Sequence, residues 1–283
     1  MNIQQIIKQL IQKGILHSEP ACYEQLSGGT VSELYLLKLK DVKYVAKINK
    51  REIVKSEAHF LHSYKETHFL PELIYTEPSY MYLVYSFLDG SAGHTGSSKK
   101  EWLRVLVRGL LNHYKPAKVR GWGWADEPAE SWQSFLMDRI SEANSILHSK
   151  VDPNVFPLVR NLVQKSRIKG DPFLLHGDFG VHNFIFKEGR LCGVIDPAPV
   201  LGPPSYDLIY AFCSSPEELT KKTIDHAAEQ LTFKRESSLY EEVLVGLYLR
   251  MAASIKHHPK DFEEYLRAWC YWESIVNDGS NLG

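Results

Sequence analysis

The chain has 283 residues, of which 44% are hydrophobic and 24% are charged, and its formal net charge at pH 7 is -1. This length can bury a large core, either in one domain or in two lobes that share a cleft. A net charge so close to zero argues against the basic surface on which nucleic-acid binding depends, so we expect no nucleic-acid partner. No segment approaches the ~20 consecutive apolar residues of a membrane span, and the four cysteines form no CxxC pair. We therefore expect a soluble, cytoplasmic protein with no membrane partner.

The first ninety residues predict a helix, then a small sheet with a second helix. Isoleucines and Leu10 recur at helical spacing between residues 3 and 11, which indicates an amphipathic first helix. After Pro20, β-branched, aromatic and leucine residues predict strands, and the spacing within 54–64 predicts a helix. The strand-like runs are YEQL (23–26), LYLLKLK (34–40), KYVAKI (43–48) and YMYLVYSFL (80–88).

The rest of the chain predicts a mainly helical lobe. The polar, Gly- and Ser-rich run GSAGHTGSSKK (90–100) suits a connection, so we expect one lobe over residues 1–88 and a second over 89–283. Apolar residues recur every three or four positions in the segments that follow. Those segments are 101–114, 131–149, 240–256 and 261–276. Between them, two short apolar runs around Gly189-Arg190 predict a β-hairpin.

The chemistry is concentrated in LLHGDFGVHNFIFKEGRLCGVIDP, residues 174–197. Four residues separate Asp178 from Asn183, and Asp196 follows after the predicted hairpin. Kinase-type phosphoryl-transfer enzymes use this spacing. Magnesium on a triphosphate prefers oxygen ligands, which Asn183 and Asp196 would supply. A carboxylate is also needed to orient the acceptor hydroxyl and to take its proton, and we assign that role to Asp178.

The motifs HGDFGVHN (176–183), VIDP (194–197) and GPPSYDL (202–208) resemble the aminoglycoside phosphotransferase and choline kinase superfamily. The resemblance is closest to its hygromycin and streptomycin phosphotransferase branch. It implies an α+β, protein-kinase-like fold with a small, mainly β N-terminal lobe and a larger helical lobe. It also implies ATP and Mg²⁺ as cofactors, and it gives His176 and Asp207 the role of bracing the catalytic loop.

The small lobe offers the partners that such a site needs for a nucleotide. Lys47, on a predicted strand, would pair with the α- and β-phosphates and with a helix glutamate, for which Glu57 is the candidate. A glycine-containing turn would cover the phosphates, and the end of the last strand of this lobe would meet the adenine through its backbone. The turn is Ser27, Gly28, Gly29 and Thr30, and the strand end is Ser86, Phe87 and Leu88.

The acceptor is less narrowly defined by the sequence. No APE-bounded activation segment follows Asp196, which argues against a protein substrate. An excess of acidic residues after Pro216, with several aromatic ones, would suit a cationic acceptor such as an aminoglycoside or aminocyclitol. The candidates are Glu217, Glu218, Trp269, Tyr271, Trp272 and Glu273. The alternative is a metabolic kinase for a sugar, a choline-like alcohol or an amino alcohol. For Gly121 to Trp124 two roles stay open, a loop near the acceptor and a structural anchor.

Overall fold

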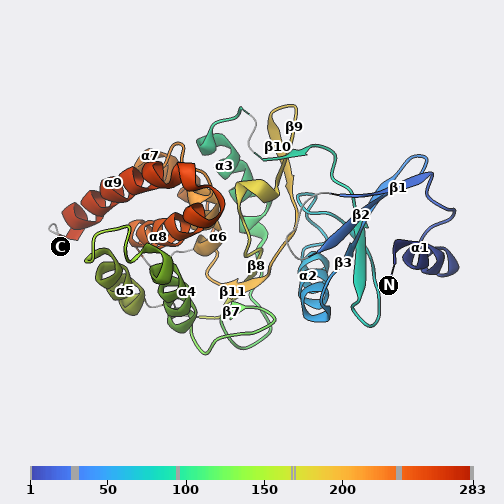
Figure 1. The fold of residues 1–283 in the computed structure, drawn as a ribbon, viewed down its shortest axis with the longest axis horizontal. Coiled ribbons are helices and arrows are strands. Elements are labelled where there is room, and N and C mark those ends of the chain that lie inside the picture. The colour runs from blue at the N-terminus through green and yellow to red at the C-terminus, as the bar shows by residue number, and fades with distance from the viewer. Residues whose placement is uncertain are drawn as a thin grey trace.

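The structure is a computed structural model in which two lobes lie side by side along the long axis of the molecule (Figure 1). It describes residues 2–26, 32–93, 96–166, 168, 170–233 and 238–280. The predicted turn of Ser27, Gly28, Gly29 and Thr30 lies outside the described residues. In the small lobe the elements are α1 (Ile3–Gln12), β1 (Cys22–Gln25), β2 (Glu33–Lys38), β3 (Lys43–Ile48), α2 (Arg51–Ser63), β4 (Leu73–Thr76) and β5 (Tyr82–Ser86).

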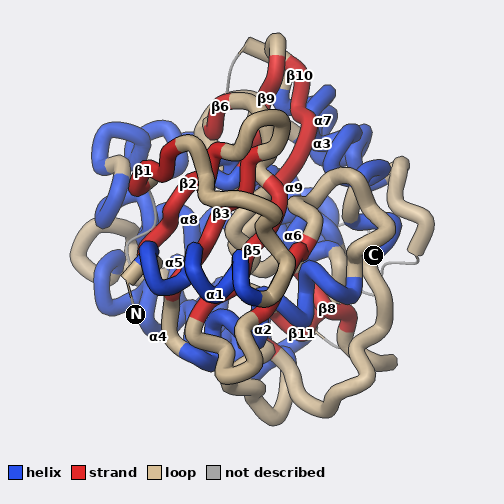
Figure 2. Tube along the Cα trace, turned by 90° about the vertical axis from the view of Figure 1, so that its right-hand side faces the viewer, coloured by secondary structure: helices blue, strands red, loops and turns tan. Residues whose placement is uncertain are grey.

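The small lobe is built on a five-stranded antiparallel sheet in the order β1-β2-β3-β5-β4. Successive residues of a strand point to opposite faces, and here both faces are apolar. Leu37 and Ala46 pack with α1, whereas their neighbours Leu36 and Val45 belong to the core that contains α2. Helix α1 crosses the outer face of the sheet (Figure 2), and Asn2 and Gln5 form a capping box at its start. The predicted first helix is therefore confirmed.

The large lobe consists of helices around two small three-stranded sheets, β10-β9-β6 and β7-β11-β8. The predicted hairpin is present as β9 and β10. The helices are α3 (Lys99–Gly109), α4 (Trp132–Leu147), α5 (Val155–Lys165), α6 (Ser205–Cys213), α7 (Lys221–Ala228), α8 (Leu239–His257) and α9 (Phe262–Ser280), with short turns η1 (Leu111–His113), η2 (Val181–Asn183) and η3 (Pro259–Asp261). The strands are β6 (Ser91–Ala92), β7 (Gly123–Trp124), β8 (Phe173–Leu175), β9 (Phe184–Lys187), β10 (Arg190–Val194) and β11 (Val200–Gly202).

The glycine- and tryptophan-rich segment anchors the large lobe. Strand β7 pairs with β11, and the ring of Trp124 packs edge-on against Phe135 of α4 at 5.7 Å between centroids. Gly123 has a φ of +82°, and an added Cβ would lie 2.3 Å from the ring of Phe135. Of the two roles left open by the sequence, the structure supports the structural anchor.

One hydrophobic core joins the lobes. It runs from Leu36 and Val54 of the small lobe to Trp269 of α9. At the junction the Tyr64 hydroxyl donates to the carbonyl of Leu174 at 2.5 Å and accepts from the amide of Lys115 at 3.0 Å.

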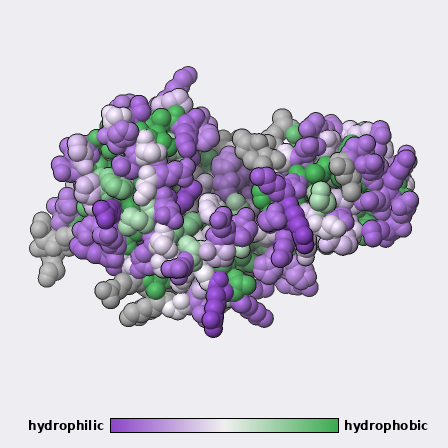
Figure 3. Space-filling model, turned by 60° about the horizontal axis from the view of Figure 1, so that its bottom comes forward, coloured by the Kyte–Doolittle hydropathy of each residue, from purple (hydrophilic) through white to green (hydrophobic). Residues whose placement is uncertain are grey.

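Hydrophilic residues cover most of the face in Figure 3. Among the described residues, no helix has both the length and the apolar character to cross a membrane. The division of the chain after residue 88 stays a prediction.

Candidate active site

A buried carboxylate of α6 holds the loop that follows β8. Asp207 accepts hydrogen bonds from the amides of His176 at 2.9 Å and Gly177 at 3.2 Å, and from the Tyr114 hydroxyl at 2.5 Å. Burial raises the pKa of Asp207 to about 7, although these three donors oppose the shift. The loop can approach β11 closely because residue 177 is glycine, with a φ of +81° and no room for a Cβ. The backbone ahead of Asp178 is therefore tightly positioned.

Asp178 stands at the centre of a hydrogen-bonded group. Its Oδ2 accepts from Nδ2 of Asn183 at 3.0 Å and lies 3.2 Å from Nε2 of His182. Its Oδ1 accepts from the Tyr210 hydroxyl at 2.7 Å. Burial alone would raise the pKa of Asp178, but the hydrogen bond and charge of His182, with the bond from Tyr210, outweigh it and lower the pKa to about 2. The carboxylate is ionised at neutral pH and has a fixed orientation.

Asp196 follows β10 in a left-handed backbone conformation, with a φ of +60°. The residue before it is tied to the Asp178 loop, because the Ile195 amide donates to the carbonyl of Asn183 at 3.0 Å and the Ile195 carbonyl lies 3.0 Å from Nε2 of His176. The side chain of Asp196 is 38% exposed. The structure thus brings Asp178, Asn183 and Asp196 together, as the spacing predicted.

Lys47 connects the small lobe to this group. Its Nζ lies 2.6 Å from Oε2 of Glu57, both side chains are buried, and the same Nζ donates to Oδ1 of Asp196. Burial lowers the pKa of Lys47, but the charges of Glu57 and Asp196 outweigh it and the pKa is raised overall. Burial also raises the pKa of Glu57 to about 6, against the opposing charge of Lys47. The predicted pairing of the strand lysine with a helix glutamate is present.

The predicted adenine-facing strand end lies where β5 leaves the sheet. The amide of Ser86 donates to the carbonyl of Glu72 at 2.9 Å, and the amide of Phe87 donates to the carbonyl of Lys43 at 3.0 Å. Leu88 makes no backbone hydrogen bond from its amide to other described residues. The role of this strand end in binding adenine stays a prediction.

The oxygen donors fit a magnesium ion that arrives with a nucleotide. Asp196 offers a partly exposed carboxylate and Asn183 an amide oxygen, since its Nδ2 is engaged by Asp178. Among the described residues, no group of three or more His, Cys, Asp or Glu could hold a metal ion. Magnesium commonly uses one or two protein oxygens and completes its shell with phosphates and water, so this donor set suits a metal–nucleotide complex.

A cavity of about 350 Å³ lies beside this group, between α4, α5, α6 and α8. Tyr210, whose hydroxyl binds Asp178, is part of its wall. The acceptor residues predicted from the C-terminal composition do not line it, and two of them, Trp269 and Trp272, are buried in the core. Tyr271 borders a separate, open depression. For Trp269 and Trp272 the predicted pocket position was wrong, because helical spacing marks an apolar face and does not say what covers it. For the other candidates it stays a prediction.

Four residues around the site were not predicted from the sequence. His182 and Tyr210 contact Asp178, and Arg139 and Arg250 line the cavity. His182 stands four residues after Asp178, and Tyr210 stands one helical turn after Asp207, so spacing alone could have nominated both. The two arginines come from helices that are distant in sequence, and no local signal links them.

The sequence matches the model of the phosphotransferase enzyme family over residues 23–237. The chain belongs to this family. Its membership confirms the predicted class of enzyme and the predicted superfamily. No curated protein gave a significant match.

Solved structures with a fold similar to this phosphotransferase include an aminoglycoside phosphotransferase and a choline kinase. A mutant of aminoglycoside phosphotransferase APH(4)-Ia, in ternary complex with AMP-PNP and hygromycin B, is 18% identical over 97% of this chain and 98% of its own, with a TM-score of 0.61. Choline kinase LicA from Streptococcus pneumoniae is 18% identical over 96% and 99% of the two chains, with a TM-score of 0.63. These likenesses confirm the predicted two-lobed, kinase-like α+β fold. The hygromycin and streptomycin branch stays a prediction.

Proposed function

We propose that this protein transfers the γ-phosphate of ATP to a hydroxyl group of a small molecule. The observation that carries the proposal is the contact between Lys47 of the small lobe and Asp196 of the large lobe. The lysine is held by Glu57, and the residue before Asp196 is hydrogen-bonded to the loop that carries Asp178 and Asn183. A cationic phosphate ligand, two oxygen donors and a candidate base thus meet in one place, as phosphoryl transfer requires.

In this proposal Lys47 binds the α- and β-phosphates, and the backbone around Ser86, Phe87 and Leu88 meets the base through the Leu88 amide. Ser27, Gly28, Gly29 and Thr30, which lie outside the described residues, keep their predicted role as the cover of the phosphates. Asn183 and Asp196 hold Mg²⁺, which neutralises the charge of the phosphate oxygens. The expected cytoplasmic location also stays a prediction.

The chemical step needs no covalent enzyme intermediate. The acceptor hydroxyl oxygen forms a bond to the γ-phosphorus, and the bond from that phosphorus to the β,γ-bridging oxygen breaks. The bridging oxygen leaves with the electron pair as part of ADP, and the hydroxyl proton passes to Asp178. Because the pKa of Asp178 is about 2, the transfer of the proton comes late, when the acceptor oxygen has become acidic through its bond to phosphorus. Tyr210 and Asn183 keep the carboxylate aimed at the acceptor.

Replacement of Asp178 by alanine tests this function. We expect Asp178→Ala to lower the rate of transfer by ~10²–10⁴-fold and to leave ATP affinity nearly unchanged, because the base acts at the reacting centre. The matched control is Asp171→Ala, at an exposed aspartate two residues before β8, which should behave as wild type. Transfer of labelled phosphate from ATP to a panel of hydroxylated acceptors measures the rate. Wild-type turnover by the Asp178→Ala enzyme would contradict the assignment.

A further inference from the structure

The cavity beside Tyr210 has mostly apolar walls. Trp132 and Leu136 of α4, Tyr206 and Ile209 of α6 and Leu249 of α8 all face it. Its volume of about 350 Å³ is at the small end of the ~300–1,000 Å³ typical of ligand pockets. A ligand held here is therefore small, and the greater part of its body is apolar.

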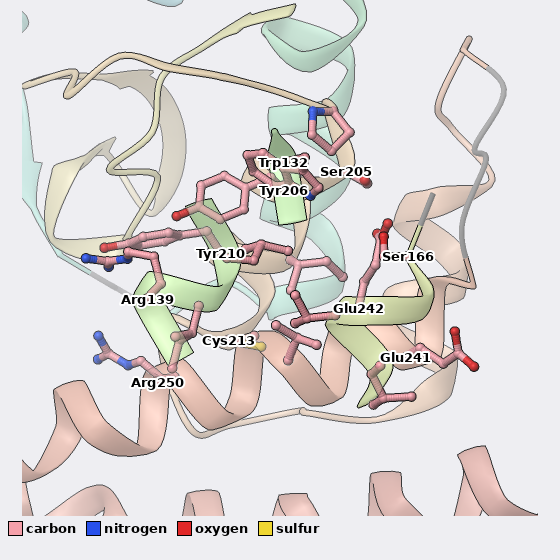
Figure 4. A pocket seen from close by; sticks show the side chains of 18 of the residues that line it. Trp132, Arg139, Ser166, Ser205, Tyr206, Tyr210, Cys213, Glu241, Glu242 and Arg250 are labelled. Atoms are coloured by element: carbon pink, nitrogen blue, oxygen red, sulfur yellow. The ribbon is translucent and has the colours of Figure 1, made fainter. Parts of the chain in front are cut away.

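Two arginines stand at the end of the cavity near Tyr210 (Figure 4). Arg139 of α4 is only weakly neutralised, since its nearest carboxylate oxygen, in Glu142, is 3.9 Å away. The guanidinium lies 5.4 Å from the ring of Trp124, and its buried Nε has no hydrogen-bond acceptor among the described residues. A buried donor without a partner carries a free-energy cost that a ligand oxygen would remove.

Arg250 of α8 also lacks a carboxylate partner among the described residues. Its Nε donates to the Tyr265 hydroxyl at 3.0 Å, and its guanidinium lies 5.5 Å from the ring of Tyr265. Both contacts are with a neutral side chain, so the positive charge is not neutralised. Burial and then the charge of Asp178 raise the pKa of Tyr210, and the charge of Arg250 opposes them. Arg250 thus lies near the residue that contacts Asp178 and lines the same cavity.

The acidic residues of the cavity lie at its other end (Figure 4). Glu241 and Glu242 belong to the first turn of α8. Arg250 follows them by eight or nine positions, which corresponds to roughly 12–14 Å along the helix axis. Among the charged lining residues labelled in Figure 4, the two arginines thus lie beside Tyr210 and the two glutamates at the other end, and Lys165 of α5 is a further cation of the lining.

We propose, on the basis of the proposed phosphotransfer, that the acceptor is a hydroxylated carboxylate with an apolar body. The carboxylate binds Arg139 and Arg250, because guanidinium groups pair with carboxylates through parallel charge-assisted hydrogen bonds. The apolar body lies against Trp132 and Tyr206, and the hydroxyl reaches past Tyr210 to Asp178. An aminoglycoside would instead place ammonium groups beside two arginines, an unfavourable arrangement in an apolar cavity.

Three probes of similar size test the proposal: 4-(hydroxymethyl)benzoate, 4-(hydroxymethyl)benzamide and 4-(hydroxymethyl)benzylamine. They share the alcohol and the apolar ring and differ in carrying a negative, a neutral or a positive group. Binding is measured by calorimetry at low ionic strength on the Asp178→Ala protein, and transfer is measured on the wild-type enzyme. We expect the benzoate to bind and react on the order of tenfold better than the benzamide, and the benzylamine to be the poorest. High salt should reduce the preference.

Arg139→Gln and Arg250→Gln should each remove most of the preference for the benzoate. The matched control is Arg104→Gln on α3, where the arginine pairs with Glu101; it removes the same charge and should keep the preference. A preference for the amine or the amide, or no measurable binding of the benzoate, overturns the proposal. An equal loss of turnover on all three probes in the arginine variants also overturns it, because the arginines would then act on the transferred phosphate. Failure of the proposed function looks different, because no acceptor of any charge would then be phosphorylated in an Asp178-dependent way.

Discussion

Replacing Gly177 with alanine tests whether the backbone ahead of Asp178 positions the carboxylate. An added Cβ would lie 1.9 Å from the carbonyl oxygen of Ala198 and 2.9 Å from Cγ2 of Val200. Gly170 provides a matched control, because its φ of +89° is close to the +81° of Gly177 but nothing lies within 4 Å of its added Cβ. The pair separates the cost of the left-handed backbone from the cost of the collision.

A left-handed conformation costs an alanine about 1–2 kcal/mol, and both variants carry that cost. Only Gly177→Ala must also move the loop away from β11, at an overpacking cost of roughly 1–3 kcal/mol. We therefore expect losses in the free energy of unfolding of about 2–5 kcal/mol for Gly177→Ala and about 1–2 kcal/mol for Gly170→Ala. Because the same shift displaces Asp178, and a misplacement of ~1 Å can cost ~10²-fold in rate, kcat should fall only in Gly177→Ala.

Urea unfolding followed by tryptophan fluorescence gives the two free energies, and transfer of labelled phosphate gives kcat. ATP affinity should fall less than kcat, because Lys47 lies on β3, away from the loop, whereas Asp196 is only two residues from Ala198. Equal losses of stability in the two variants, together with an unchanged kcat in Gly177→Ala, would refute the idea that this close approach positions the base.

Three further predictions concern charged groups. Asp196→Asn should weaken magnesium–nucleotide binding and transfer together, because an amide removes a negative oxygen from a divalent site; calorimetry with and without magnesium checks this, and an unchanged magnesium dependence would place the metal elsewhere. Lys47→Met should destabilise the fold by about 3 kcal/mol, because it leaves Glu57 buried without its partner. In urea unfolding the double variant Lys47→Met/Glu57→Gln should recover most of that stability, and the absence of recovery would contradict the pairing. Burial lowers the pKa of Lys99 to about 7, so the folded state binds fewer protons than the unfolded state between about pH 7 and 10.5, and stability should rise with pH in that window. Relative to Lys99→Met, the wild type should gain roughly 2 kcal/mol between pH 7 and pH 9, and a flat difference would show that the lysine stays charged.

The local elements and the chemistry of one short segment could be predicted from residue spacing alone. Asp178, Asn183 and Asp196 fall within 19 residues that fold through the local hairpin of β9 and β10. Their mutual positions follow from short-range backbone pairing, so spacing was a sufficient guide. The same holds for Lys47, whose flanking residues alternate between the two faces of β3 as a strand requires.

Which distant groups meet could not be predicted from spacing, because it depends on how the helices and lobes pack. Lys47 and Asp196 are 149 positions apart and are brought together by the packing of the two lobes. The cavity with Arg139 and Arg250 arises where α4 and α8 pack around α6, and no local pattern records that contact. The same packing placed Trp269 and Trp272 in the core instead of in a pocket. Helical periodicity shows which side of a helix is apolar, whereas the partner that buries it is selected by the shape and volume of the whole core.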